Sequence, residues 1–324
     1  MRQKWFTPSM NVWNTRHYKR LIKWGGAILF LSSLFLYFQV SFFTIGMISA
    51  PLFAPSAETP SAEAFEALSQ SYFYLGKGKQ AFAFTSRDGK WVLKFFNQKY
   101  FQPGIRSLFS EKERIKRAKR KQFYLESYPI AQKMLSDETG IVYLHFGVSS
   151  TPLPKASVTD WWGRRHVIDL NKAPFVLQKR ANPLYPSFNE LSQKELECAI
   201  GEFLSIVASR IDKKIADGDH HVEHNYGMLG KHIIQIDPGR LYFHEHLWER
   251  EHLDHEWWSA THQLRKWLKK NHPECLISFD RQIETSRKFR LKDQSLPDLF
   301  QGCDRCAHGE SGCNSIIDHE DCPS

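Results

Sequence analysis

The sequence lacks the marks of several common protein classes. No internal repeat is visible, and with 42% hydrophobic and 24% charged residues the chain does not have the composition of a disordered or fibrous protein. Its 324 residues are enough for one large or two modest domains with a buried core. Disorder along the whole chain is therefore excluded.

Acidic residues are missing from residues 1–24. The basic residues there are Arg2, Lys4, Arg16, Lys19, Arg20 and Lys23. The whole chain has a formal net charge of +9, so these six residues leave only +3 for residues 25–324. The positive excess is local, and nucleic acid is not an expected partner.

Charged residues are also absent from positions 25–50, where Gln39 is the one strongly polar side chain. As a helix this run would be about 39 Å long, which exceeds the roughly 30 Å hydrocarbon layer of a bilayer. The apolar region of a cleaved signal peptide is shorter, about 7–15 residues. A buried core helix rarely runs this far without a charge, so we expect a single transmembrane helix at 25–50.

The flanks of this run set its orientation, because basic residues precede it and none follows until Lys77. The positive-inside rule makes residues 1–24 a basic cytoplasmic tail and places the large domain outside the cytoplasm, in a lumen or periplasm. Residues 51–67 are rich in Pro, Ala, Ser and Glu, which predicts a linker. The expected protein is single-pass and contacts the membrane through residues 25–50.

Cysteine is scarce except near the C-terminus. Four of the six cysteines lie in residues 301–324, at Cys303, Cys306, Cys313 and Cys322. An even count fits disulfides in an oxidising compartment, whereas a Cys-x2-Cys spacing beside histidines fits zinc equally well. Disulfides, zinc and free thiols all stay open for this Cys-rich tail.

Strand patterns dominate the first half of the large domain. Residues 72–96 alternate apolar and polar side chains in two stretches separated by Arg87-Asp88-Gly89, which predicts a hairpin. Short runs of β-branched and bulky apolar residues predict further strands at 141–146, 166–170 and 174–179. We expect these strands to form an antiparallel sheet.

Helix signals mark three other places. Ser110 with Glu113 and Ser192 with Glu195 both fit the capping box that opens a helix. After the second box, apolar residues recur at the spacing of one helical face. A third helical pattern, heavy in Trp and His, covers residues 248–270.

The order of these elements predicts an α+β fold in two parts. Residues 68–182 would form a β-rich N-lobe and residues 183–300 an α-rich C-lobe. A basic run at residues 112–121 lies in the helix of the first part. It fits a solvated helix face, or a surface for a partner or for anionic lipid.

Two features of residues 72–96 are of a kind that binds phosphate. Gly76 and Gly78 lie at a bend between strands, where missing side chains let backbone amides approach phosphate oxygens. Lys94 lies in an apolar strand, where an ammonium group needs solvent or an anionic partner.

Carboxylates and an amide follow the long helix that starts after Ser192. Asp217, Asp219 and Asn225 lie in a His-rich segment, and Asp237 ends an apolar, strand-like run. Such groups, presented from loops on a rigid scaffold, are what phosphoryl transfer requires: one orients and deprotonates a hydroxyl, and two hold magnesium.

Together these motifs make residues 72–270 resemble the protein kinase-like superfamily, which includes protein kinases and small-molecule phosphotransferases. The resemblance implies a two-lobed fold that binds ATP. It also implies that Gly76 and Gly78 cover the nucleotide phosphates and that Lys94 binds the α- and β-phosphates. A helical glutamate would pair with Lys94: Glu126 is the first candidate and Glu113 the second.

The resemblance also implies roles for the later motif. Asn225 and Asp237 match the two positions that hold Mg²⁺, with Asp-Pro-Gly where the family usually has Asp-Phe-Gly. The catalytic aspartate usually lies five residues before the asparagine, but His220 is found there. Asp219, six before, is the expected base, with Asp217 as the second candidate.

The predicted function is that of a membrane-anchored phosphotransferase that uses Mg-ATP to phosphorylate a hydroxyl on protein, glycan or lipid. The missing His-Arg-Asp motif leaves a pseudokinase, acting as a binding scaffold, as an alternative. A metal-dependent hydrolase is a further alternative, because imidazoles surround the same carboxylates. These imidazoles belong to His220, His221, His224 and His232.

Overall fold

The computed structural model has an α+β architecture with a mixed sheet. The chain divides into two units, Met1–Thr44 and Ile45–Ser324. The residues described are 23–33, 43–49, 59–101, 110–146 and 151–293, with side chains up to residue 287. The predicted Cys-rich tail at 301–324 and most of the basic tail at 1–24 lie outside them.

The segment predicted to be a transmembrane helix falls only partly within the described residues. Residues 23–33 form an exposed helix in the first unit, but residues 34–42 are not among those described. Ile45–Met47 form a short 3₁₀ helix (η1) of the second unit, and Met47 and Ile48 are buried. The prediction of one continuous α-helix is therefore wrong at its C-terminal end. No helix in the described part of the chain is long and apolar enough to cross a bilayer.

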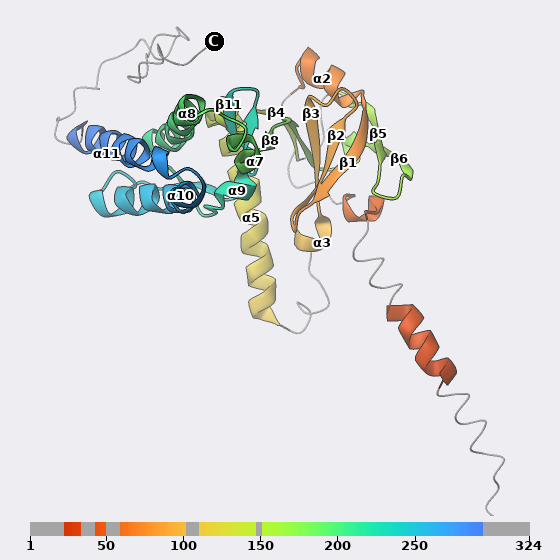
Figure 1. The fold of residues 1–324 in the computed structure, drawn as a ribbon. Coiled ribbons are helices and arrows are strands. Elements are labelled where there is room, and N and C mark those ends of the chain that lie inside the picture. Colours follow the sequence, from red (N-terminus) through yellow and green to blue (C-terminus); the bar gives the residue numbers. More distant parts are fainter. Residues whose placement is uncertain (1–22, 34–42, 50–58, 102–109, 147–150, 294–324) are drawn as a thin grey trace, which may run out of the picture. The chain divides into compact units, whose positions relative to one another are not determined.

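A seven-stranded sheet forms the first half of the second unit, with strand order β4-β7-β3-β2-β1-β5-β6 (Figure 1). The strands are β1 (Ser71–Lys77), β2 (Ala81–Ser86), β3 (Trp91–Phe96), β4 (Ile141–His145), β5 (Lys155–Thr159), β6 (Arg165–Asp169) and β7 (Phe175–Lys179). The strands predicted from alternation are confirmed. The sheet is mixed rather than antiparallel, because β1 and β5 pair in parallel.

The predicted hairpin is the β2–β3 pair, and the bend with the glycines joins β1 to β2. Asp88 closes the β2–β3 turn by accepting hydrogen bonds from the Ser86 hydroxyl and from the Lys90 backbone N–H. Gly89 has φ +73°, a conformation that side chains disfavour. Local side-chain chemistry therefore fixes the register of β3, on which Lys94 lies.

Helix α5 (Glu111–Met134) begins at Ser110, whose hydroxyl accepts a hydrogen bond from the Glu113 backbone N–H. Its last turns pack Tyr124, Tyr128 and Ala131 against Phe96 of β3 and against residues of the second half of the unit. Short helices flank the sheet: α2 (Ala62–Leu68), α3 (Gln98–Phe101) and α6 (Ser136–Thr139), with η2 (Leu170–Lys172). Helix α5 thus joins the sheet to the rest of the domain.

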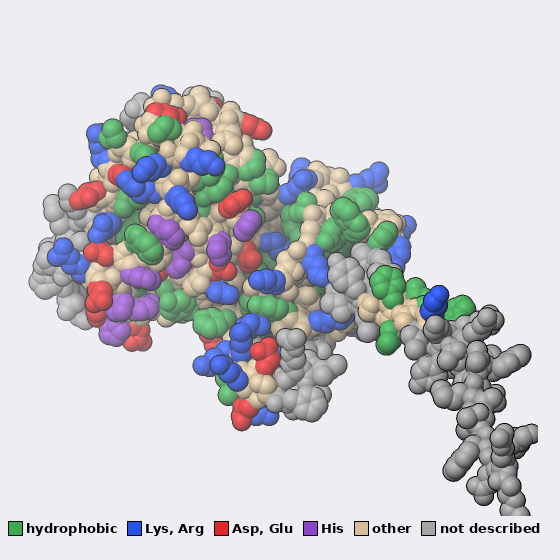
Figure 2. All heavy atoms as spheres, turned by 60° about the horizontal axis from the view of Figure 1, so that its bottom comes forward, with side chains coloured by type: hydrophobic (Ala, Val, Ile, Leu, Met, Phe, Trp, Pro, Cys, Tyr) green, Lys and Arg blue, Asp and Glu red, His purple; other side chains and the backbone are tan. Residues whose placement is uncertain are grey.

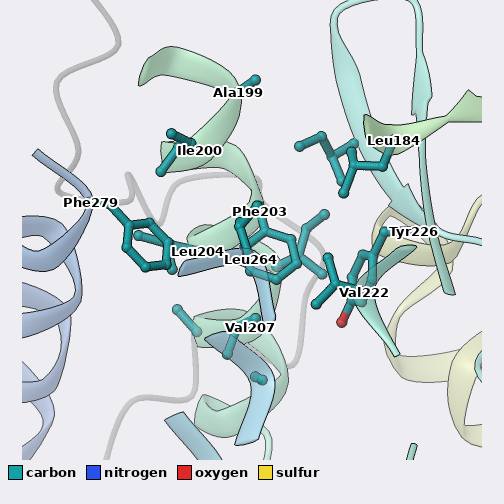
Figure 3. Packing of buried hydrophobic residues seen from close by; sticks show 14 of the residues in the cluster. Leu184, Ala199, Ile200, Phe203, Leu204, Val207, Val222, Tyr226, Leu264 and Phe279 are labelled. Atoms are coloured by element: carbon teal, nitrogen blue, oxygen red, sulfur yellow. The ribbon is translucent and has the colours of Figure 1, made fainter. Parts of the chain in front are cut away.

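Helices dominate the second half of the unit. The long ones are α8 (Gln193–Asp212), α10 (Arg250–Asn271) and α11 (Leu276–Asp293), with shorter α7 (Leu184–Phe188), α9 (Val222–Asn225) and η3 (Pro273–Cys275). Helix α8 has the predicted capping box, and its apolar face is buried. Phe203 and Val207 of α8 pack against Leu264 of α10 and Phe279 of α11 (Figure 3). Sequence analysis did not identify α11.

Short strands carry the segments between the helices. A three-stranded sheet joins β8 (Asn182–Pro183), β10 (Tyr226–Leu229) and β11 (His232–Gln235), and a two-stranded sheet joins β9 (Ile215–Asp217) and β12 (Leu241–Phe243). Gln178 of β7 donates a hydrogen bond to the Gln235 carbonyl, 3.2 Å away. This contact ties the large sheet to the segment that contains Asp237.

His145, at the end of β4, should make the fold sensitive to acid. Its ring is buried beside Phe175, with ring centroids 5.2 Å apart, and burial lowers its pKa to about 4 from 6.5. Between these pH values the unfolded chain binds a proton that the folded chain does not. The free energy of unfolding should therefore decline as pH falls from 6.5 towards about 4.

Thermal unfolding measured across this pH range tests the prediction. The melting temperature of His145→Phe should fall less than that of the wild type, because the mutant has lost the titrating group. His255→Phe, at an exposed position on α10, serves as the matched control and should behave as the wild type does. Equal acid sensitivity of all three proteins would contradict the role given to His145.

Candidate active site

Lys94 lies in a row of residues that crosses the sheet. Gly76 pairs with Ala83, Ala83 with Lys94, and Lys94 with Val176, so these residues occupy one line across β1, β2, β3 and β7. Neighbouring strands lie about 4.8 Å apart, which places Gly76 roughly 10 Å from Lys94. The glycine bend and the strand lysine therefore lie on the same part of the sheet.

The local structure does not require a glycine at either Gly76 or Gly78. A Cβ atom on Gly76 would meet nothing within 4 Å, and one on Gly78 would meet only backbone atoms, at 3.8 Å or beyond. Neither has a positive φ. The space beside these backbones is open, as it must be for a ligand to approach them closely.

The Lys94 ammonium group reaches across to the segment after β11. It donates a hydrogen bond to the Ile236 carbonyl, and Asp237 is the charged group that acts on it. Burial lowers the pKa of Lys94, and the Asp237 carboxylate opposes this shift. The sequence separation is 142 residues, so only the tertiary fold brings the two groups together.

Asp237 is held by three neighbours. Its carboxylate accepts hydrogen bonds from the Tyr128 hydroxyl and the Gly239 backbone N–H, and Lys94 supplies an opposite charge. Burial raises the pKa of Asp237, Lys94 lowers it, and nearby Asp219 raises it further. This effect of Asp219 on the pKa of Asp237 is that of a like charge nearby.

Asn225 links the same two aspartates. Its side-chain Nδ2 donates to the Asp219 carbonyl at 2.7 Å, and its own carbonyl accepts from the backbone N–H of Ile236 at 2.7 Å and of Asp237 at 3.3 Å. Helix α9 (Val222–Asn225) lies between Asp219 and the end of this segment. A separation of six residues therefore still brings Asp219 to Asn225.

Asp217 is buried beside Asp219 and stabilises this loop through hydrogen bonds. It is 3% exposed, and its two carboxylate oxygens accept from the Asp219 backbone N–H at 2.8 Å and from Gln235 Nε2 at 2.7 Å. Burial raises its pKa, with Arg210 opposing. Asp219 is the more exposed of the two, with 26% of its side chain accessible, so it is the one that can meet a substrate.

A buried ion pair lies beneath this loop. Arg210 of α8 donates to Glu256 of α10 and to the Ile215 carbonyl, and Glu256 also accepts from the Asp217 backbone N–H at 3.2 Å. Burial raises the pKa of Glu256, but Arg210 and His220 overcome this and bring it down to about 2. The pair was not predicted, although Arg210 lies three residues after Val207 on an otherwise apolar helical face.

Glu126 is not brought to Lys94. It is exposed on α5 and accepts a hydrogen bond from Gln122 at 2.8 Å, so the expected ion pair is wrong in this structure. The face of α5 that meets the site carries hydroxyl groups instead: Tyr128 donates to Asp237, and Ser127 donates to the Pro238 carbonyl and accepts from the Leu241 N–H. The aromatic residues close together in the second half of α5 could have identified this buried face from the sequence.

The histidines of the metal-hydrolase alternative do not converge. His220 meets Glu256 at 3.5 Å, His232 meets Glu202 at 2.8 Å, and His221 lies 4.0 Å from Asp219. Among the described residues, no group of three or more His, Cys, Asp or Glu side chains is arranged to hold a metal ion.

Cys275 is a buried free thiol.

Comparison with known proteins gives solved structures of WbdD. A high-resolution crystal structure has a TM-score of 0.37 at 12% identity, covering 69% of this chain and 50% of that one. A structure described as the bifunctional kinase-methyltransferase WbdD has a TM-score of 0.35 at 11% identity, covering 79% of this chain and 54% of that one. A co-crystal of WbdD with the kinase inhibitor LY294002 has a TM-score of 0.36 at 12% identity, covering 66% of this chain and 45% of that one.

The chain thus spans about half the length of these solved structures. No family model matches the sequence, and no curated protein matches it.

Replacing Glu256 tests the buried pair. Glu256→Leu leaves the Arg210 charge buried without its partner and should lower the free energy of unfolding by about 3–5 kcal/mol. The double variant Arg210→Met/Glu256→Leu removes both charges and should recover most of that loss. Urea unfolding followed by circular dichroism gives both numbers.

The exposed pair Arg265–Asp280 is the matched control, with its side chains 49% and 45% accessible. Removing Asp280 should cost less than about 1 kcal/mol. A double variant as unstable as Glu256→Leu would contradict this account, because it would mean that the charges themselves are not what destabilises the single variant.

Proposed function

We propose that the chain is a kinase-like phosphotransferase that uses Mg-ATP to phosphorylate a hydroxyl group. The observation that carries the proposal is the convergence of Lys94, on a strand of the large sheet, with Asp219, Asn225 and Asp237, which lie in a segment far from it in the sequence. This set combines a cation for phosphates, oxygen ligands for a hard metal ion and a partly exposed carboxylate.

The residues present fit a bound Mg²⁺ ion. Asp237 offers a carboxylate, and Asn225 offers its amide oxygen, because its Nδ2 is the atom that donates to Asp219. Carboxylate and amide oxygens are the ligands that Mg²⁺ takes, usually together with substrate phosphates. When bound, the ion would neutralise charge on the phosphates that are being transferred.

Each side chain has a defined task in this proposal. Lys94 and the open backbone at Gly76 and Gly78 hold the nucleotide phosphates. Asp219 orients the acceptor hydroxyl and takes its proton. The acceptor oxygen forms a bond to the γ-phosphorus, the bond from that phosphorus to the β,γ-bridging oxygen breaks, and ADP leaves.

A pseudokinase remains the second candidate, because no His-Arg-Asp motif is present and Asp219 lies six residues before Asn225 rather than five. In such a scaffold the same residues would bind nucleotide without transfer. The two candidates predict the same binding and differ in turnover alone.

We keep membrane anchoring as a proposal from hydropathy. The apolar run that starts at residue 25 and ends before the buried Met47 and Ile48 would hold the chain to the membrane, with the N-terminus cytoplasmic and the large domain in a lumen or periplasm. Protease protection on intact vesicles tests the orientation: digestion of the large domain from the cytoplasmic side would contradict it.

Mg-ATP binding is the first test of the proposed activity. At 100 times its dissociation constant a ligand stabilises the folded state by about 2.7 kcal/mol, which a thermal-shift titration of the full chain resolves. Lys94→Ala and Asp237→Asn should abolish the shift. Lys90→Ala, on the exposed turn of the same hairpin, is the matched control and should keep it.

Asp219→Asn separates the two candidates. It should keep the Mg-ATP shift and lower phosphate transfer by roughly 10²–10⁴-fold, because it removes the base and none of the proposed nucleotide ligands. Transfer is followed as ADP release with a pool of hydroxyl compounds. Nucleotide binding with no turnover by the wild type would favour the scaffold, and no binding at all would defeat both.

A further inference from the structure

A pocket of about 710 Å³ opens beside the proposed catalytic loop. One wall is the first half of α5, the second is Gln80 at the glycine bend, and the third is formed by Gly218, Arg240 and Tyr242. This volume falls in the range of roughly 300–1,000 Å³ that holds small-molecule ligands. The pocket therefore has the size of a small acceptor and touches the glycine bend, α5 and the catalytic loop.

The pocket wall formed by α5 carries four basic residues beside the apolar side chains of Ile115 and Phe123. Its cations are Lys112, Lys116, Lys119 and Arg120, which follow the spacing of one helical face. The acidic residues at the start of α5 are already engaged, Glu111 with Arg114 and Glu113 with Arg117. No acidic residue lines the described pocket. Figure 2 shows Lys and Arg side chains gathered on the projecting end of the second unit, where α5 lies.

Tyr124 adds a polar group at the base of the pocket. The residue is 6% exposed and lines the cavity, yet its hydroxyl has no hydrogen-bond partner among the described residues. A buried hydroxyl without a partner is costly, and a ligand that accepted its hydrogen bond would remove that cost. A ligand that reached this hydroxyl would find a donor as well as positive charge.

The pocket also adjoins the proposed base. Gly218 and Arg240 line it, Gly218 precedes Asp219 in the chain, and Arg240 Nε lies 3.8 Å from Asp219 Oδ2. Arg240 also donates to the Gly218 carbonyl at 3.4 Å. A molecule in the pocket would therefore lie beside Arg240, the residue that contacts the Asp219 carboxylate.

We propose that this pocket binds the acceptor and that the acceptor is a small hydroxyl compound carrying a phosphate group. The inference rests on the proposed phosphotransferase function and names its substrate class. The lysines, Arg120 and the Tyr124 hydroxyl hold the acceptor's phosphate, and its hydroxyl faces Asp219. The hydroxyl oxygen then forms the bond to the γ-phosphorus as its proton moves to Asp219, and ADP departs with the bridging oxygen.

A concave pocket favours this acceptor over an extended surface partner. The cations surround a bounded cavity that also contains a buried hydroxyl, and a flat bilayer surface does not reach such a group. A phosphate can come from a free molecule or from a lipid headgroup, and the shape of the pocket favours the free molecule. Anionic vesicles therefore form a separate arm of the test.

Calorimetric titration of the full chain with glucose 6-phosphate, and with glucose as the uncharged match, tests the proposal. The phosphate ester should bind and glucose should not. Lys112→Gln/Lys116→Gln/Lys119→Gln should weaken the binding at least about tenfold, because charge-assisted contacts are lost. Lys266→Gln/Lys269→Gln/Lys270→Gln makes the same charge change on α10. Its affinity for glucose 6-phosphate should stay within about twofold of the wild-type affinity.

Tyr124→Phe removes a single hydroxyl and keeps the packing. This variant should bind glucose 6-phosphate about two- to tenfold more weakly than the wild type does. Saturating Mg-ATP should not displace the ester, because the residues assigned to the nucleotide phosphates, Lys94, Gly76 and Gly78, do not line the pocket.

Several results would overturn the proposal. They are no binding of glucose 6-phosphate in the millimolar range, an equal loss in the two lysine triples, or displacement by Mg-ATP. Binding to phosphatidylglycerol vesicles but not to glucose 6-phosphate would replace the acceptor site with a membrane surface. A wild type that binds the ester but not Mg-ATP would defeat the proposed function and leave only an anion pocket.

Discussion

The contact between Lys94 and the Ile236–Asp237 segment is the constraint on which the candidate site depends. Lys94 belongs to a strand of the large sheet, and Asp237 follows a short strand packed among the helices. Each charge is partly removed from water, and each is stabilised by the other. Together with the hydrogen bond from Gln178 to the Gln235 carbonyl, this pair joins the sheet to the helical half through polar groups.

The rest of the structure holds the two sides of that contact in place. On one side, the turn at Asp88 and the pairing of β3 with β2 and β7 fix the register of Lys94. On the other side, α5 binds the segment after Asp237 through Tyr128 and Ser127. Asp217 supports the neighbouring loop from inside and joins it to Gln235.

The buried Arg210–Glu256 pair extends this support to the helices. Glu256 contacts the backbone at Asp217, so α8 and α10 position the loop through a charge pair rather than through apolar packing alone. Removing one partner of such a pair is costly, because the other charge stays buried.

Sequence patterns predicted the individual elements and residues of the candidate site better than the tertiary contacts between them. The strand with Lys94, the capped helix α8 and the aspartates of the loop follow from local periodicity and composition, which depend on neighbours in sequence. Glu126 shows the limit, because helical spacing places it on α5 but the orientation of α5 against Pro238 decides which face meets Lys94. Arg210, Glu256 and Tyr128 act through partners distant in sequence, and no local pattern identifies such partners.

The mixed sheet has the same explanation. Alternation in β1 predicts a strand, but its parallel pairing with β5 joins segments more than 80 residues apart. Likewise, the apolar run at 25–50 predicts one helix, whereas Met47 and Ile48 are buried in the second unit. In both cases tertiary packing decided what the local pattern left open.

A crystal structure of the full chain with Mg²⁺ and a non-hydrolysable ATP analogue tests the central claim most directly. The account predicts the ion bound to the Asn225 amide oxygen and the Asp237 carboxylate, with the Lys94 ammonium group on the phosphates. Nucleotide bound away from the row of Gly76 and Lys94, or a metal ion held by histidines instead, would contradict it.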